Sequence, residues 1–150
     1  MTAGHALHTH ERFEFVVNAE LAITWPLFGA DQERVWAPGW QPLFIWPEQP
    51  ADLPGMVFKV RHADSTAVWV NTLLDRTTGR IQYVYVIPDV LVTVISLNLK
   101  ALGTSTHVDV LYERTALDAA ANDRVSAMAA NDRIAGAGWS RQINAYLRAP

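Results

Sequence analysis

The strongest constraint on the fold is a run of five strand-like segments between residues 56 and 113. Apolar and polar residues alternate along each segment, which is typical of a strand with one face on a core. Turn-forming stretches of three to five residues separate the segments: ADST, DRTTG, PDV and KALG. Connections this short join neighbouring strands in antiparallel order. We therefore expect one antiparallel meander.

The segments on either side of the meander complete an α+β plan. Residues 13–17 alternate as a strand, residues 43–46 fit a short one, and two short helices fit between them. After Thr115 the chain is rich in alanine and carries apolar residues at helical spacing, namely Val125, Met128, Ala135, Trp139 and Ile143. The sequence predicts a sheet of about seven strands with a long C-terminal helix, in a single domain spanning residues 1–150.

Composition excludes several classes of function. The chain has no cysteine, which excludes disulfides, thiolate nucleophiles and thiolate metal sites. Its net charge is −3 and its basic residues are dispersed, so nothing favours a nucleic-acid partner. No apolar run approaches the roughly 20 residues of a membrane-spanning helix, and no signal-peptide pattern is present. We expect a cytoplasmic protein without membrane insertion, and its oligomeric state stays open.

The first nine residues precede the first alternating segment, so we expect residues 1–9 to be flexible. They carry His5 and His8, and His10 follows. Imidazoles two residues apart on a strand face can bind a metal, but no third ligand is evident beside them. We therefore expect neither a metal site nor a cofactor.

The turns also predict how the strands pair. DRTTG places Trp69 opposite Tyr85, Asn71 opposite Tyr83, and Leu73 opposite Ile81. PDV then places Tyr85 opposite Thr93, and KALG places Thr93 opposite Tyr112. Residues that face each other share one side of the sheet, so a slip of one residue would invert the assignment.

The inner face predicted in this way is apolar except at six polar or amphipathic side chains, which are Trp69, Asn71, Tyr83, Tyr85, Thr93 and Tyr112. Buried polar groups need a protein partner, a water molecule or a ligand. These residues are either ordinary core aromatics with hydrogen-bonded hydroxyls or the walls of a small-molecule cavity.

A segment rich in tryptophan and proline, ERVWAPGWQPLFIWPEQP, precedes the meander. Trp36, Trp40 and Trp46 are separated by proline and glycine, so they cannot form one face of a continuous helix. These tryptophans either close one end of the core or form the rim of a cavity, since tryptophan covers a large area and keeps one polar tip.

The order of elements resembles the helix-grip fold of the START-like (SRPBCC) superfamily, which includes polyketide cyclases/dehydrases and chaperone-ATPase-activator-like proteins. The local matches are FEFVVNAELAITWPLF, WAPGWQPLF, GMVFKV, VWVNTLLD, IQYVYVIPD and THVDVLYERTAL. The resemblance implies a curved sheet wrapped on the C-terminal helix, with an apolar cavity between them. The short helices and the first loops would form its mouth, with Trp36 and Trp40 beside it.

The resemblance implies three alternative functions. The first is binding of a small hydrophobic or amphipathic molecule, with aromatic walls and with Asn71 and Thr93 as hydrogen-bonding anchors. The second is a polyketide cyclase/dehydrase-type enzyme, in which a tyrosine or His62 supplies proton transfer. The third is a chaperone-linked protein-interaction domain with an incidental pocket. A large exposed apolar patch around the tryptophans would favour this alternative.

Catalytic groups are sparse on the predicted inner face. His62 shares its parity with Phe58 and Val60 and is the one acid/base candidate there, because histidine titrates near neutrality. Ser105, His107 and Asp109 contain the letters of a hydrolytic triad, but they fall on the outer face. With no inward carboxylate, lysine or arginine expected, binding is favoured over catalysis.

Overall fold

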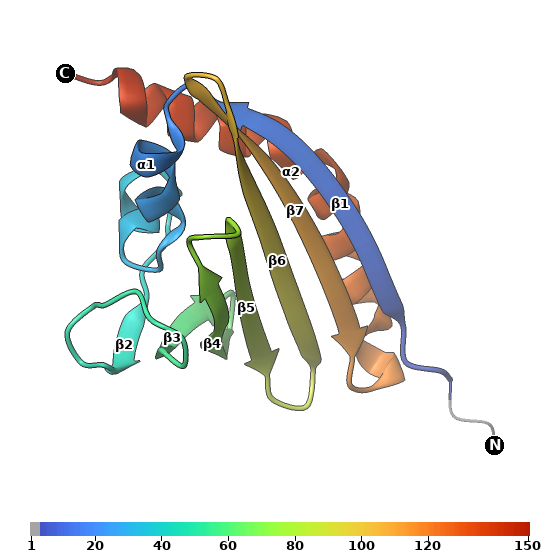
Figure 1. The fold of residues 1–150 in the computed structure, drawn as a ribbon. Helices are drawn as coiled ribbons and strands as arrows, with labels where there is room; N and C mark the ends of the chain where they lie inside the picture. The colour runs from blue at the N-terminus through green and yellow to red at the C-terminus, as the bar shows by residue number, and fades with distance from the viewer. Residues whose placement is uncertain (1–3) are drawn as a thin grey trace.

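The computed structural model describes residues 4–150, which form a seven-stranded antiparallel sheet with a long helix packed across it (Figure 1). The spatial order of the strands is β1-β7-β6-β5-β4-β3-β2. Their bounds are β1 His8–Val17, β2 Leu43–Trp46, β3 Val57–His62, β4 Ser65–Asp75, β5 Arg80–Ile87, β6 Leu91–Leu102 and β7 Ser105–Ala116. The predicted α+β arrangement is confirmed.

Short helical segments connect β1 to β2, and the long helix ends the chain. The helical elements are α1 Leu21–Thr24, η1 Trp25–Phe28, η2 Gln32–Val35, η3 Ala119–Ala121 and α2 Asn122–Arg148. Pro26 lies in the first turn of η1 and cannot donate a backbone hydrogen bond, so α1 is only one turn long. The Asp118 carboxylate caps η3 by accepting a hydrogen bond of 2.8 Å from the Ala120 amide.

Helix α2 packs mainly against β1 and β7. In the view of Figure 1, the short helical segments between β1 and β2 lie above β2 to β4, near the C-terminal end of α2. Gly136 allows a close approach to β1, since a Cβ atom there would lie 3.2 Å from the Glu14 carbonyl oxygen. Near the C-terminus, Asn144 accepts a hydrogen bond of 2.8 Å from the Asn18 amide and donates one of 3.2 Å to the Val16 carbonyl oxygen.

The register agrees with the sequence prediction in the centre of the sheet and differs at two places. Trp69 faces Tyr85 and Asn71 faces Tyr83, but an irregularity at Thr72 then places Leu74, not Leu73, opposite Ile81. The extra residue of a β-bulge moves every later side chain of its strand by one position. The pairing of Leu73 with Ile81 was therefore wrong.

The second difference is the hairpin between β6 and β7. Strand β6 continues through KAL, and Leu102 pairs with Ser105 across a two-residue loop in which Gly103 has a φ of 61°. Thr93 therefore faces Arg114, whereas the sequence placed it opposite Tyr112. The predicted pairing of β6 with β7 is displaced by two residues. Because side chains alternate between the two faces with a period of two, the inner and outer faces of these strands were still assigned correctly.

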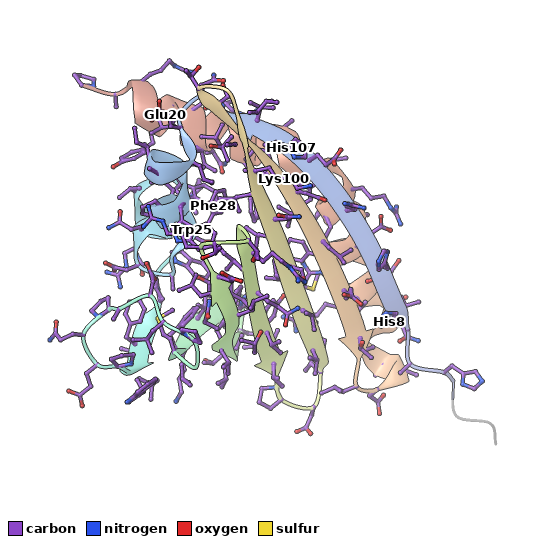
Figure 2. All side chains as sticks on the ribbon, in the orientation of Figure 1. His8, Glu20, Trp25, Phe28, Lys100 and His107 are labelled. Atoms are coloured by element: carbon purple, nitrogen blue, oxygen red, sulfur yellow. The ribbon has the colours of Figure 1, made fainter. Side chains whose placement is uncertain are left out.

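Ser105, His107 and Asp109, the residues that a hydrolytic triad would need, lie on the outer face of the sheet. His107 and Asp109 lie next to charged side chains of β1. Asp109 forms an ion pair with Arg12, and the His107 imidazole lies 3.7 Å from the Glu14 carboxylate. Lys100 and His107 face each other on β6 and β7, as their positions in Figure 2 show. These side chains are on the convex surface, away from α2.

The N-terminal segment makes hydrogen bonds to β7 and α2. Strand β1 begins at His8, whose imidazole is hydrogen-bonded to the Thr115 hydroxyl at 2.8 Å. The Leu7 amide donates a hydrogen bond of 2.7 Å to the Asn122 side chain, whose amide group donates one of 2.9 Å to the His5 carbonyl oxygen. The expected flexibility of residues 1–9 stays a prediction, and residues 1–3 lie outside the described residues.

We predict that Asn122→Ala destabilises the protein by about 1 kcal/mol, because it removes both side-chain hydrogen bonds that hold the N-terminal segment. Urea unfolding would measure the change. Asn131→Ala is the matched control: it lies in the same local sequence, AANDR, but at an exposed position of α2. Equal effects of the two substitutions would contradict the anchoring role of Asn122.

Candidate functional site

A cavity of about 330 Å³, partly open to solvent, lies between the sheet, α2 and the segment that follows η2. Strands β3 to β7 each contribute side chains to it from their inner face. Its aromatic lining consists of Trp36, Trp40, Trp69, Tyr83, Tyr85, Tyr112 and Trp139. Aliphatic surface comes from Ile95, Leu97 and Met128. The structure thus brings together most of the side chains that the sequence assigned to a ligand site.

Two of the expected site residues lie behind the cavity wall. Thr93 is fully buried, and its hydroxyl accepts a hydrogen bond of 3.0 Å from Arg114. Asn71 is also buried, and neither polar atom of its side chain has a hydrogen-bond partner within the described residues. Neither residue is among those that line the cavity. Their role as ligand anchors stays a prediction that the position of the cavity does not support.

One wall of the cavity is a stack of parallel rings. Trp69 and Tyr85 face each other across β4 and β5, with ring centroids 4.5 Å apart and planes inclined by 14°. The His62 imidazole is nearly parallel to both rings, with its centroid 5.0 Å from that of Tyr85 and 6.1 Å from that of Trp69. Burial and the nearby Arg114 and Arg124 lower the pKa of His62, so the neutral imidazole is favoured at neutral pH.

The tryptophans after η2 close one end of the core and line the cavity at the same time. The Trp36 indole donates a hydrogen bond of 2.7 Å to the Leu27 carbonyl oxygen, and the Trp40 indole donates one of 2.6 Å to that of Ala30. Phe28, labelled in Figure 2 between the short helical segments and the sheet, packs against Trp36 with ring centroids 5.9 Å apart. Both predicted roles, closure and rim, therefore apply to these side chains.

Trp46 and its neighbours differ from the other tryptophans. Trp46 is 55% exposed on the edge strand β2, and Leu43 and Ile45 beside it are also exposed. Of the three tryptophans in this segment, only Trp46 therefore contributes to an exposed apolar surface. Trp36 is buried and Trp40 is largely covered, so they do not extend it.

The sequence reasoning missed a buried ion pair at the inner end of the cavity. The Arg114 guanidinium donates two hydrogen bonds of 2.8 Å to the Asp132 carboxylate on α2. It also donates hydrogen bonds of 2.6 Å to the Tyr85 hydroxyl and 3.0 Å to the Thr93 hydroxyl. Both charged residues are only 5% exposed. The expectation of no inward arginine was wrong, because the sequence reading ended the last strand at Glu113.

A second charged group was also missed. Glu33 on η2 lines the cavity among the tryptophans, and burial, together with the carboxylate of Asp52, raises its pKa to about 8. The expectation of no inward carboxylate was therefore wrong. A 3₁₀ turn of four residues has too short a pattern to show which side chain points inward. The spacing of residues in the sequence therefore gave no indication that Glu33 faces the cavity.

Two of the tyrosines that line the cavity remain protonated near neutral pH. Burial raises the pKa of Tyr83 and of Tyr112 well above that of a free phenol. The Tyr83 hydroxyl donates a hydrogen bond of 2.9 Å to the Phe28 carbonyl oxygen. These groups can serve as walls and hydrogen-bond donors near neutral pH, but not as bases.

Residues 4–150 contain neither a cluster of candidate metal ligands nor a membrane-spanning helix. No group of three or more histidine, aspartate or glutamate side chains is placed to hold a metal ion. Within the same residues, no helix is long and apolar enough to cross a membrane.

We predict that Arg114→Met destabilises the protein by about 3–5 kcal/mol, because Asp132 is left as an unpaired buried charge. The double variant Arg114→Met/Asp132→Leu should recover most of this loss, since it removes both charges. Urea unfolding of the single and double variants would measure the coupling. Arg12→Met breaks an exposed ion pair and should change stability little. An Arg114→Met effect as small as that of Arg12→Met would contradict the structural role of the pair.

No protein-family model matches the sequence, and no curated protein is similar to it in sequence. Several solved structures are similar in fold. Truncated norcoclaurine synthase from Thalictrum flavum aligns over 100% of this chain and 99% of its own, with a TM-score of 0.72 and 11% identity. Ara h 8.0201 aligns over 93% and 97%, with a TM-score of 0.68 and 15% identity.

The Zhui aromatase/cyclase from Streptomyces sp. R1128 aligns over 95% of both chains, with a TM-score of 0.67 and 14% identity. The likeness to these proteins extends over nearly the whole chain and includes the curved sheet, the short helical segments and the C-terminal helix. Identities this low establish the fold and nothing finer. The chain has the helix-grip fold, as the order of its sequence elements predicted.

Proposed function

We propose that this protein binds a small, ring-bearing, mostly apolar molecule in the cavity between its sheet and α2. The observation that carries the proposal is the lining: a cavity of about 330 Å³ walled by seven aromatic side chains and a few polar groups. Cavities of this size and composition are typical of small-molecule sites. At the density of a protein interior, the cavity accommodates a ligand of roughly 10–20 non-hydrogen atoms.

In the proposed site, the aromatic walls are those expected from the sequence, but the polar groups that contact the ligand are different. Tyr85 accepts a hydrogen bond from Arg114, so its own hydroxyl proton is available for an acceptor on the ligand. Glu33 offers a second polar contact nearer the tryptophan segment. These two groups take the place that the sequence assigned to Asn71 and Thr93.

The structural comparisons support a ring-bearing ligand in a fold of this kind. Norcoclaurine synthase from Thalictrum flavum, with a TM-score of 0.69 and 10% identity over 97% of this chain and 90% of its own, was solved in complex with dopamine and hydroxybenzaldehyde. The nearly parallel rings of Trp69, Tyr85 and His62 offer an aromatic surface against which a planar ligand can stack. We also propose the cytoplasm as the compartment of this chain.

An enzyme that uses the same cavity is a second candidate, and Glu33 favours it. A carboxyl group whose pKa is raised to about 8 can accept or donate a proton near neutral pH. Strongly shifted groups inside a cavity are common at catalytic sites. The neutral His62 and the Tyr85 hydroxyl are the other groups able to move or hold a proton there.

The protein-interaction alternative has less support. The exposed apolar side chains of the tryptophan-rich segment include Leu43, Ile45 and Trp46 on the short edge strand β2, whereas Trp36 and Trp40 are turned inward.

We predict that Met128→Trp lowers the affinity for naphthalen-2-ylmethanol, a neutral two-ring probe, by at least tenfold. The larger indole would occupy cavity volume that the flexible methionine leaves free. Met128→Leu conserves the volume and should bind within about twofold of the parent. Isothermal titration would give both affinities. Unchanged binding by a folded Met128→Trp protein would place the probe outside this cavity.

The enzyme alternative predicts proton exchange at a carbon of the natural ligand. Native mass spectrometry of freshly purified protein would first identify whatever co-purifies. Incubation of that compound with the protein in D₂O, at concentrations that saturate the parent and the variant alike, followed by NMR, should then show deuterium incorporation that Glu33→Gln abolishes. Binding without incorporation in the parent protein would reject the enzyme alternative and leave the binding proposal intact.

A further inference from the structure

Glu33 has no counterion among residues 4–150. This half-buried residue lines the cavity, and no basic side chain of the described residues forms an ion pair with it. The neighbouring Arg34 is directed elsewhere: its guanidinium lies 3.3 Å from the Asp31 carboxylate and donates a hydrogen bond of 3.1 Å to the Pro42 carbonyl oxygen. Glu33 is thus an acid held against an aromatic cavity without a cation beside it.

The other charges around the cavity do not compensate Glu33. Arg114 is neutralised by Asp132, and four of its N–H groups are used by Asp132, Tyr85 and Thr93. Among the cavity residues of α2, Met128, Trp139 and Gln142, none is ionisable.

The remaining groups near Glu33 are neutral or acidic. His62 on β3 is biased to its neutral form, and the phenols of Tyr83 and Tyr112 stay protonated. Asp52, in the loop before β3, adds negative charge near Glu33. The charge that the cavity lacks is therefore positive.

The surface around Glu33 suits a cation as well. Trp36, Trp40 and Trp69 line the cavity with Glu33, and the indole N–H groups of the first two are already bound to backbone carbonyls. What these two rings offer a ligand is their carbon surface. The face of an indole ring attracts a cation more strongly than that of any other side chain, and more so where water is excluded.

We propose that the ligand of this cavity carries a cationic nitrogen next to its ring system, and that Glu33 is its counterion. This inference rests on the proposed binding function and specifies the class of ligand. An organic ammonium placed among the tryptophans would gain cation–π contacts and a charge-assisted hydrogen bond to the Glu33 carboxylate. A neutral ligand with a carbonyl group is the competing class, since a protonated Glu33 can donate to it.

The two ligand classes differ in how affinity depends on pH. With its pKa raised to about 8, Glu33 is mostly protonated at pH 7 in the empty cavity. A bound ammonium favours the carboxylate and expels the proton, so affinity should rise about tenfold per pH unit below pH 8 and level off above it. A neutral acceptor prefers the protonated acid, and its affinity should fall as the pH rises through 8.

Two probes of equal size separate these classes: naphthalen-2-ylmethylamine, which is protonated at neutral pH, and naphthalen-2-ylmethanol, its neutral counterpart. Isothermal titration at pH 6, 7 and 8 should show at least tenfold tighter binding of the amine at pH 8, with affinity increasing with pH. Glu33→Gln should remove this preference and its pH dependence, while binding the alcohol within about twofold of the parent. Glu48→Gln removes the same charge at an exposed position outside the cavity and should change neither.

Three results would be decisive against these proposals. Equal or tighter binding of the alcohol at pH 8 would overturn the cation inference and leave ring binding in place. Amine binding that is unchanged in Glu33→Gln would likewise remove Glu33 as the counterion. If neither probe binds the folded parent protein, the proposed binding function itself fails. Retained alcohol binding by Glu33→Gln shows that the variant is folded, so loss of amine preference can be assigned to the charge.

Discussion

A guanidinium that is buried between a sheet and a helix needs a partner, and Asp132 provides one for Arg114 with two hydrogen bonds of 2.8 Å. This pair joins β7 to α2 at the inner end of the cavity, where a purely apolar contact would leave the spacing of helix and sheet less defined. The same guanidinium orients the hydroxyls of Tyr85 and Thr93 on two further strands. The shape of the inner end of the cavity therefore depends on one ion pair and its hydrogen bonds.

The outer end of the cavity is held by different means. Proline and glycine prevent a regular helix after η2, so the chain can direct Trp36 and Trp40 inward, where backbone carbonyls of the preceding segment accept their N–H groups. Trp36 also packs on Trp139 of α2, with ring centroids 5.4 Å apart. In this segment, the packing of aromatic side chains thus contributes the stability that regular secondary structure contributes elsewhere.

These two ends differ in charge. Arg114 is neutralised within the protein, whereas Glu33 is left without a cation among the aromatic rings. Burial without a partner is what raises the pKa of a carboxyl group, and a group in that state responds to whatever enters the cavity. Under the proposed function, Glu33 is the side chain whose protonation a bound ligand would change most directly.

Strict alternation and short turns determined the strand number, the antiparallel order and which side chains face inward, because these depend on local periodicity alone. The same periodicity held signals that were overlooked: Arg114 continues the inward series of Val108 and Val110, and Asp132 lies seven residues after the buried Val125. Only the tertiary structure decided the bulge at Thr72, the two-residue hairpin at Gly103 and the inward direction of Glu33. The direction of Glu33 depends on contacts with segments distant in sequence, which a pattern of neighbouring residues does not encode. The bulge and the hairpin set the register between adjacent strands, which alternation along a single strand does not specify.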